Sequence, residues 1–198
     1  GGVTVLATIK AQPRSSAGSK TSSTGSAVGG AVARGKFTNT ATAYIGQGAA
    51  VDAKGALLVD AHTLVPYPWQ INWNDLDEVL SFLQGGILDM FLSTYSINSA
   101  KGKTGIGLAV GVNIYDLANS AEAYIDEGAR INNRYKAIPG LALQSVKVNA
   151  ANDISLTGAG GILSKKFLGT SGGKAAIGGS AGLLSVDTQA SATIRGNA

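Results

Sequence analysis

The sequence predicts an all-β solenoid in which successive coils of the chain stack on one another. The first observation is a repeated segment: residues 43–49 (Ala-Tyr-Ile-Gly-Gln-Gly-Ala) return as residues 123–129 (Ala-Tyr-Ile-Asp-Glu-Gly-Ala), and a more divergent copy occupies residues 192–198 (Ala-Thr-Ile-Arg-Gly-Asn-Ala). A unit that recurs in this way buries its apolar face against its neighbours. The second observation is that each copy follows an apolar stretch interrupted by glycines, at residues 27–33, 105–114 and 175–184.

The composition favours narrow, closely stacked strands. Of the 198 residues, 28 are glycine and 44% are hydrophobic, whereas only 14% are charged and 6% are aromatic. The four prolines and the absence of a three-residue glycine period exclude collagen. The chain has no cysteine, which excludes disulfides and thiolate metal sites. Its net charge of +4 is spread out without a Lys/Arg-rich run, so we expect no nucleic-acid partner.

The first segment with a clear pattern is a strand near the beginning of the chain. Val3, Val5, Ala7 and Ile9 alternate with more polar residues, which predicts a strand with one apolar face. The Ser/Thr-rich stretch at residues 12–26 has no such period, so we expect an exposed loop there.

The clearest predicted strand covers residues 106–114. A helix is disfavoured because a glycine at alternate positions would cost about 1 kcal/mol each. A row of glycines in a strand indicates that another backbone or layer approaches closely. For the solenoid as a whole we expect Val, Ile and Leu inside and Thr, Asn and Lys outside. In this strand the large residues Ile106, Leu108, Val110, Val112 and Ile114 share one face, and the small residues Gly107, Ala109, Gly111 and Asn113 share the other.

The spacing of the repeat predicts an insertion. Tyr44 and Tyr124 are 80 residues apart, which is too long for one coil of a solenoid. We therefore expect β-helix coils at residues 1–61, a helical insertion at about residues 62–100, and coils of the same solenoid at residues 101–198.

Within the insertion, the pattern changes to that of an amphipathic helix. Asn74 can cap its start, with Asp77 at the third helical position. We expect this helix to pack on the flank of the solenoid. A second hypothesis is that the insertion also presents aromatic side chains to a partner, because exposed aromatics mark interaction sites. The helical apolar positions are Leu76, Leu80, Leu83, Ile87 and Phe91, and the candidate partner contacts are Tyr67, Trp69 and Trp73.

Motifs that carry chemistry are incomplete. Gly102-Lys103-Thr104 is similar to the end of a phosphate-binding loop, but Ile97 stands where the first glycine belongs. The single histidine, His62, follows Asp60 on one strand face, yet no Gly-x-Ser-x-Gly motif supplies a nucleophile. Zinc-ligand spacings and calcium-binding repeats are absent from the sequence. We therefore predict no catalytic residue, no cofactor site and no metal site.

A polysaccharide-active β-helix enzyme is the less favoured alternative. Such an enzyme needs paired carboxylates, or a basic residue, grouped on one face. In this chain no acid–base pair can be placed, because the acidic residues fall in different coils. They are Asp52, Asp60, Asp116, Asp126 and Glu127.

The succession of a glycine-spaced strand, a polar turn, Ala-Tyr-Ile-Gly-x-Gly-Ala, Val-x-Ala-x-Gly and a final strand such as Leu-Leu-Val-Asp-Ala resembles filamentous-haemagglutinin-like adhesins and leukotoxin-type exoproteins of bacteria. The resemblance covers most of residues 1–61 and 101–198. It implies a right-handed parallel β-helix, export of the unfolded chain through an outer-membrane secretion partner, and a place outside the cell or on its surface. It also implies roles in adhesion, biofilm or cell contact, and thereby in virulence.

The sequence therefore predicts a non-enzymatic, structural and adhesive segment of a secreted surface protein. Its expected partner is a host-cell or surface receptor or glycan. The alternative is a subunit that assembles with copies of itself into an extracellular fibre, because a solenoid with uncapped coils exposes unpaired strand edges.

Overall fold

The computed structural model describes residues 1–66, 93–134, 145–160 and 170–198, and the regular structure in these residues is β-strand without any helix. Every strand pairing is parallel. The prediction of an all-β fold is confirmed. In chain order the strands are β1 (Val3–Lys10), β2 (Ser15–Ser23), β3 (Ala27–Ile45), β4 (Ala50–Val51), β5 (Leu57–Val65), β6 (Thr94–Gly102), β7 (Ile106–Ile125), β8 (Arg130–Ile131), β9 (Val146–Ile154), β10 (Gly158–Gly160), β11 (Thr170–Gly172) and β12 (Ala175–Ile194).

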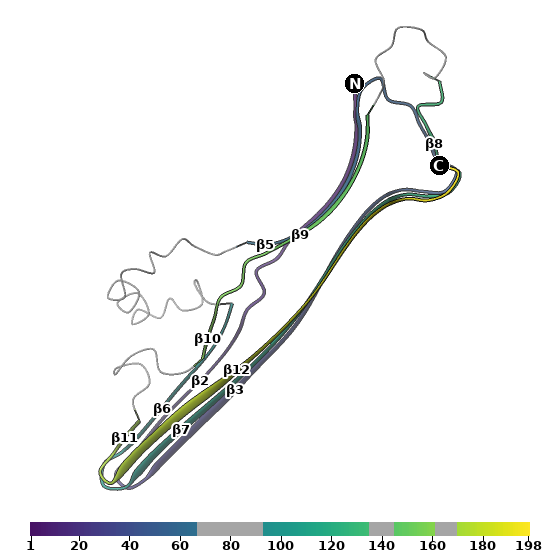
Figure 1. Cartoon of the computed structure of the whole chain (residues 1–198). Helices are drawn as coiled ribbons and strands as arrows, with labels where there is room; N and C mark the ends of the chain where they lie inside the picture. Colours follow the sequence, from purple (N-terminus) through teal and green to yellow (C-terminus); the bar gives the residue numbers. More distant parts are fainter. Residues whose placement is uncertain (67–92, 135–144, 161–169) are drawn as a thin grey trace.

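The chain visits four sheets repeatedly and in the same order. Sheet A has the order β1-β5-β9, sheet C has the order β3-β7-β12, and sheet D contains β4 and β8. In sheet B, β6 pairs with β2, β10 and β11. Each of β1 to β4 therefore pairs with the strand that comes four places later. Sheets A and B follow one another along one side of the molecule, and the long strands of sheet C run along the other (Figure 1).

The repeated segment lies in sheet C, with its copies side by side. Tyr44 is the register partner of Tyr124, and Ile45 is the partner of Ile125. Ile125 is in turn the partner of Ile194. The prediction that the copies stack on one another is confirmed.

Each copy ends in a tight turn, and the backbone takes the same unusual φ in all three turns. The third residue of each turn has a positive φ, of 69° at Gly48, 71° at Gly128 and 58° at Asn197. Glycine adopts this conformation without steric cost, and asparagine is among the few residues that also tolerate it. The turn chemistry therefore explains why glycine or asparagine stands at this place.

β5 and β6 both extend into the range predicted for the insertion, about residues 62–100. β5 continues to Val65, and β6 begins at Thr94. The alternation of buried residues in β5 runs on until Pro66, which cannot donate a backbone hydrogen bond. The 80-residue spacing is thus one return of the chain to sheet C by way of β5 and β6. The predicted helix falls within residues 67–92, outside the described residues.

The prediction of an exposed loop at residues 12–26 is wrong, because β2 lies within this range. The nine residues of β2 pair in parallel with β6. The Ser19 hydroxyl donates a hydrogen bond to Asn98 Oδ1 at 3.0 Å. The residues that β2 meets in the interior are small, as at Gly29 and Gly35, or polar, as at Asn98. The strand therefore needs no apolar face, and hydrophobic alternation gives no signal for it.

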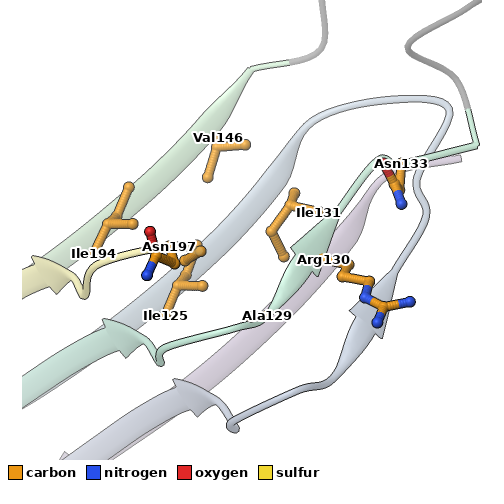
Figure 2. A pocket seen from close by; sticks show the side chains of 9 residues that line it. Ile125, Ala129, Arg130, Ile131, Asn133, Val146, Ile194 and Asn197 are labelled. Atoms are coloured by element: carbon orange, nitrogen blue, oxygen red, sulfur yellow. The ribbon is translucent and has the colours of Figure 1, made fainter.

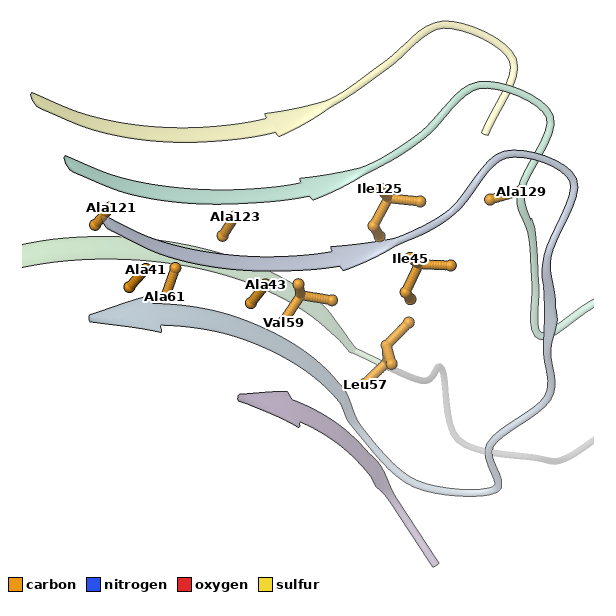
Figure 3. Packing of buried hydrophobic residues seen from close by; sticks show 10 residues of the cluster. All are labelled: Ala41, Ala43, Ile45, Leu57, Val59, Ala61, Ala121, Ala123, Ile125 and Ala129. Carbon is orange, nitrogen blue, oxygen red and sulfur yellow. The ribbon is translucent and has the colours of Figure 1, made fainter. Parts of the chain in front are cut away.

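The interior changes character along the molecule. Where sheet B faces sheet C, the buried side chains are small, as at Ala100 and Ala109, or polar, as at Ser96 and Asn98. Where sheet A faces sheet C, the interior is aliphatic (Figure 3). That cluster contains Ala41, Ala43, Ile45, Leu57, Val59, Ala61, Ala121, Ala123, Ile125 and Ala129.

The expectation that Val, Ile and Leu lie inside and Asn and Thr outside is wrong for the first half of sheet C. There the face of β7 that carries the small residues is buried, whereas Val28 and Val32 of β3 are 68% and 69% exposed. The cause is the nearness of sheet B. A Cβ atom on Gly29 would lie 3.2 Å from the Ser99 carbonyl oxygen, and one on Gly111 would collide with Asn98 Nδ2. The close approach inferred from the glycine row is confirmed, and it turns the large residues outward.

Tyr115 fills the junction between the two kinds of interior. Its side chain is fully buried, and its hydroxyl donates a hydrogen bond to the Pro13 carbonyl oxygen at 3.1 Å. Its ring packs on Phe37, with the ring centroids 5.2 Å apart. Tyr115 therefore ties sheet C to the segment that connects sheets A and B.

The Gly111→Ala substitution should lower the free energy of unfolding by about 1–3 kcal/mol, because the added Cβ overpacks the contact with Asn98. The matched control is Gly179→Ala, since a Cβ at Gly179 meets nothing within 4 Å. The control should be neutral or stabilising, by up to about 1 kcal/mol. Urea unfolding followed by circular dichroism measures both, and equal effects would contradict the close packing of sheets B and C.

Tyr115 should make stability depend on alkaline pH. Burial raises the pKa of Tyr115 from 10.0 to about 12. The folded protein thus holds this proton more tightly than the unfolded chain does, so the free energy of unfolding is unaffected below pH 10 and falls as the pH rises from 10 towards 12.

Urea unfolding at successive pH values tests this with two phenylalanine variants. Tyr115→Phe should remove the part of the fall in the free energy of unfolding at alkaline pH that Tyr115 causes. At neutral pH it should lower the free energy of unfolding by about 1 kcal/mol, because the hydrogen bond is lost. Tyr44→Phe, at a side chain that is 53% exposed, should leave the decline unchanged. An identical decline in both variants would show that Tyr115 does not cause it.

Candidate binding surface

The outward face of sheet C carries aliphatic side chains in its first half, and these are exposed or half-buried. By register, Val28, Leu108 and Ile177 form one row across β3, β7 and β12. Ile177 is 60% exposed and Leu183 is 63% exposed. We name this surface the outer patch: Val28, Val32, Leu108, Val110, Val112, Ile177 and Leu183. Exposed apolar side chains gathered on one face make this surface a candidate for an interaction site.

The second half of the same face is polar and ends in an aromatic stack. The rings of Tyr44 and Tyr124 are stacked, with centroids 5.2 Å apart and planes inclined at 14°. The Arg195 guanidinium lies 4.0 Å from the centroid of the Tyr124 ring, a cation–π contact. Arg195 also donates hydrogen bonds to Glu122 at 3.3 Å and to Asp126 at 3.2 Å. The outward face therefore has an apolar half and a charged, aromatic end.

The β12 edge of sheet C exposes residues whose register partners are buried. Leu184 is 58% exposed, although its partner Tyr115 is fully buried. Ile194 is 59% exposed, and its partner Ile125 is 1% exposed. The inward face of sheet C is therefore open to solvent along β12.

A pocket of about 370 Å³ lies near the end of β12, beside β8 (Figure 2). Sheet D has two strands here, whereas sheets A and C each have three. Aliphatic side chains form much of its wall, and Arg130, Asn133 and Asn197 add polar groups. Such a lining suits an aliphatic side chain or a short extended segment. The remaining lining residues are Ile125, Ala129, Ile131, Val146, Ile194 and Ala198.

The residues considered for catalysis do not converge in the described part of the chain. His62 Nε2 lies 2.9 Å from Asp153 Oδ2 of β9. Asp60 instead accepts a hydrogen bond from Asn149 at 2.7 Å. Within residues 1–66, 93–134, 145–160 and 170–198, no group of three or more His, Asp or Glu side chains is placed to hold a metal ion.

The candidate partner contacts Tyr67, Trp69 and Trp73 lie outside the described residues. The sequence does not identify the outer patch, because the alternation of apolar residues in it predicts a buried face. The glycines opposite were the signal that could have identified it. No helix in the described ranges is long and apolar enough to cross a membrane.

Comparison with known proteins adds no relative. No protein-family model, curated protein or solved structure matches the chain. Its function must therefore be inferred from its own surface and from the way its strands stack.

Proposed function

We propose that the chain is part of a right-handed parallel β-helix, a solenoid in which each coil adds one strand to each sheet. The support is the fixed order of the strands: β1 to β4 are followed by β5 to β8 on the same sheets, and β9 to β12 begin a third round. The recurring turn at Gly48, Gly128 and Asn197 also supports coils of one design. In such a fold, stability comes from the stacking of neighbouring coils.

The proposed role is that of a non-enzymatic, structural and adhesive segment of a secreted bacterial surface protein. The observation that carries the adhesive part is the outer patch. Its aliphatic rows lie on a sheet with regular parallel pairing, and Arg34 and Lys36 continue the same face of β3 beyond Val32. A surface of this chemistry suits a host-cell or surface receptor, or the apolar faces of a glycan, as partner.

Secretion is proposed from the resemblance and from the composition. A chain that crosses an outer membrane unfolded through a secretion partner is helped by having no cysteine that could form disulfides on the way. Stacked coils of small residues can then form outside the cell without a redox step.

A structural role is also supported by the hydrogen bonds of three aspartates. Asp126 is engaged by Arg195, Asp60 by Asn149, and Asp52 by the backbone N–H of Arg134 at 3.1 Å. These carboxylates join one coil to the next.

The test of adhesion is the double substitution Val28→Ser and Val32→Ser. Because both side chains are more than two-thirds exposed, at 68% and 69%, the fold should keep its strand circular dichroism. Binding to cultured host cells and to immobilised glycans should fall by about tenfold or more, as expected when apolar anchors at the centre of an interface are lost.

The matched control is the double substitution Thr38→Ser and Thr40→Ser, on the outward face of the same strand. It should bind like the unaltered chain. If the valine variant binds as well as this control, the outer patch is not the adhesive surface.

A further inference from the structure

The rows that contain the outer patch have neither an acidic nor an uncharged polar side chain. From the row of Ile106 to the row of Ile114, the outward positions of sheet C hold aliphatic residues, alanine, glycine and a single arginine. These rows extend about 26 Å along the strands and about 10 Å across them. By register they are Ile106 and Ala175; Val28, Leu108 and Ile177; Gly30, Val110 and Gly179; Val32, Val112 and Ala181; and Arg34, Ile114 and Leu183.

The exposure of this surface is clearest on β7, which has a paired strand on each side. Ile106 is 46% exposed and Val110 is 48% exposed, although both neighbouring strands are present. The row of Val110 has glycine on either side, at Gly30 and Gly179, so no side chain shields the valine. The apolar surface is therefore a property of the face of the sheet.

Cations lie at both ends of these rows. Arg34 and Lys36 follow the aliphatic residues along β3, and Lys103 and Lys174 precede β7 and β12, where the chain turns from sheet B into sheet C (Figure 1). All four side chains are exposed, and none forms an ion pair with a residue that the structure describes. The first acid on this face, Asp116, lies in the row of Lys36. The apolar rows are thus bordered by free positive charge.

We infer that the outer patch binds a lipid bilayer that carries anionic head groups. This inference rests on the proposed adhesive role of the patch and names a lipid surface as its partner. The aliphatic side chains enter the boundary between head groups and acyl chains, and the four cations contact the phosphates. Interfacial binding of this kind increases with the apolar area buried and with the attraction to anionic lipid. Each Lys or Arg near such a surface raises the affinity about fivefold.

A bilayer fits the outer patch better than a glycan or a protein does. The apolar rows offer no hydroxyl, amide or carboxylate, so the hydroxyls of a glycan would lose water there without gaining a partner. The centres of protein interfaces are enriched in Trp, Tyr and Arg, whereas Leu and Val are under-represented. The outer patch has only Val, Leu and Ile. The apolar part of a bilayer requires no hydrogen bond from the protein surface.

The opposite face, on sheet B, provides a matched control. Lys20 of β2 and Lys101 of β6 are exposed there. They point away from sheet C, because the adjacent Ser19 approaches Gly29 and the adjacent Ala100 is buried. The two faces therefore both carry cations, but the described outward positions of sheet B beside these lysines are polar or glycine, as at Gly18 and Ser22.

The experiment is flotation of the chain with vesicles made of equal parts of phosphatidylcholine and phosphatidylserine. We expect binding that is at least about tenfold weaker with phosphatidylcholine alone, and that weakens as salt is added. The double substitution Arg34→Gln and Lys36→Gln should lower the affinity at least about tenfold, because two cations leave the contact. The matched control, Lys20→Gln and Lys101→Gln, removes the same charge from the opposite face and should lower it less than about threefold.

A fluorescent probe locates the contact. The chain has no cysteine, so Val110→Cys provides a single thiol for a polarity-sensitive fluorophore. Its emission should move to shorter wavelength when anionic vesicles are added, because the probe enters an apolar environment. The same probe on Ser22→Cys, on the outward face of sheet B, should keep its emission.

The inference is overturned if the unaltered chain does not bind the anionic vesicles, if the two glutamine variants lose affinity equally, or if both probes respond alike. Attachment to cells or glycans that depends on Val28 and Val32, without binding to vesicles, would keep the proposed adhesion and reject the lipid partner. Vesicle binding that Val28→Ser and Val32→Ser abolish, with attachment to cells unchanged, would keep the lipid partner and reject the proposed adhesion.

Discussion

Parallel, in-register pairing in sheet C is the constraint on which the rest of the structure depends. β7 pairs with β3 over the whole 19 residues of β3, and β12 pairs with β7 over 20 residues. Such pairing places each side chain beside its counterpart one coil later, so a row must contain residues of compatible size. The isoleucine row at Ile45, Ile125 and Ile194 meets this condition. The repeat in the sequence is the consequence of this geometry.

The distance between the layers decides what fills each part of the interior. Sheet B lies so close to sheet C that a Cβ on Gly111 would collide with Asn98, and small residues follow from that. Sheet A leaves room for Leu57 and Val59, both fully buried. Tyr115 lies between the small or polar interior under sheet B and the aliphatic interior under sheet A. Burial of its side chain raises the pKa of its phenol.

The same geometry determines the surface. Because the small face of sheet C is turned inward, the aliphatic face is left outside as the outer patch. Because the pairing is parallel, the outer strands of sheet C are unlike, and β12 leaves Leu184 and Ile194 open. The proposed attachment therefore uses the aliphatic face of sheet C.

The sequence by itself determined the all-β class, the strand at β1, the stacking of the repeat and the close approach at the glycine row, because these follow from local periodicity and side-chain size. The tertiary structure alone decided which face is buried: the alternation from Ile106 onward is the same whichever side faces inward, and only the position of sheet B resolves it. It also decided that Ser15–Ser23 is a strand, because its pairing with β6 is made by the backbone and needs no hydrophobic pattern. Long-range pairing of this kind leaves little trace in a local window of sequence.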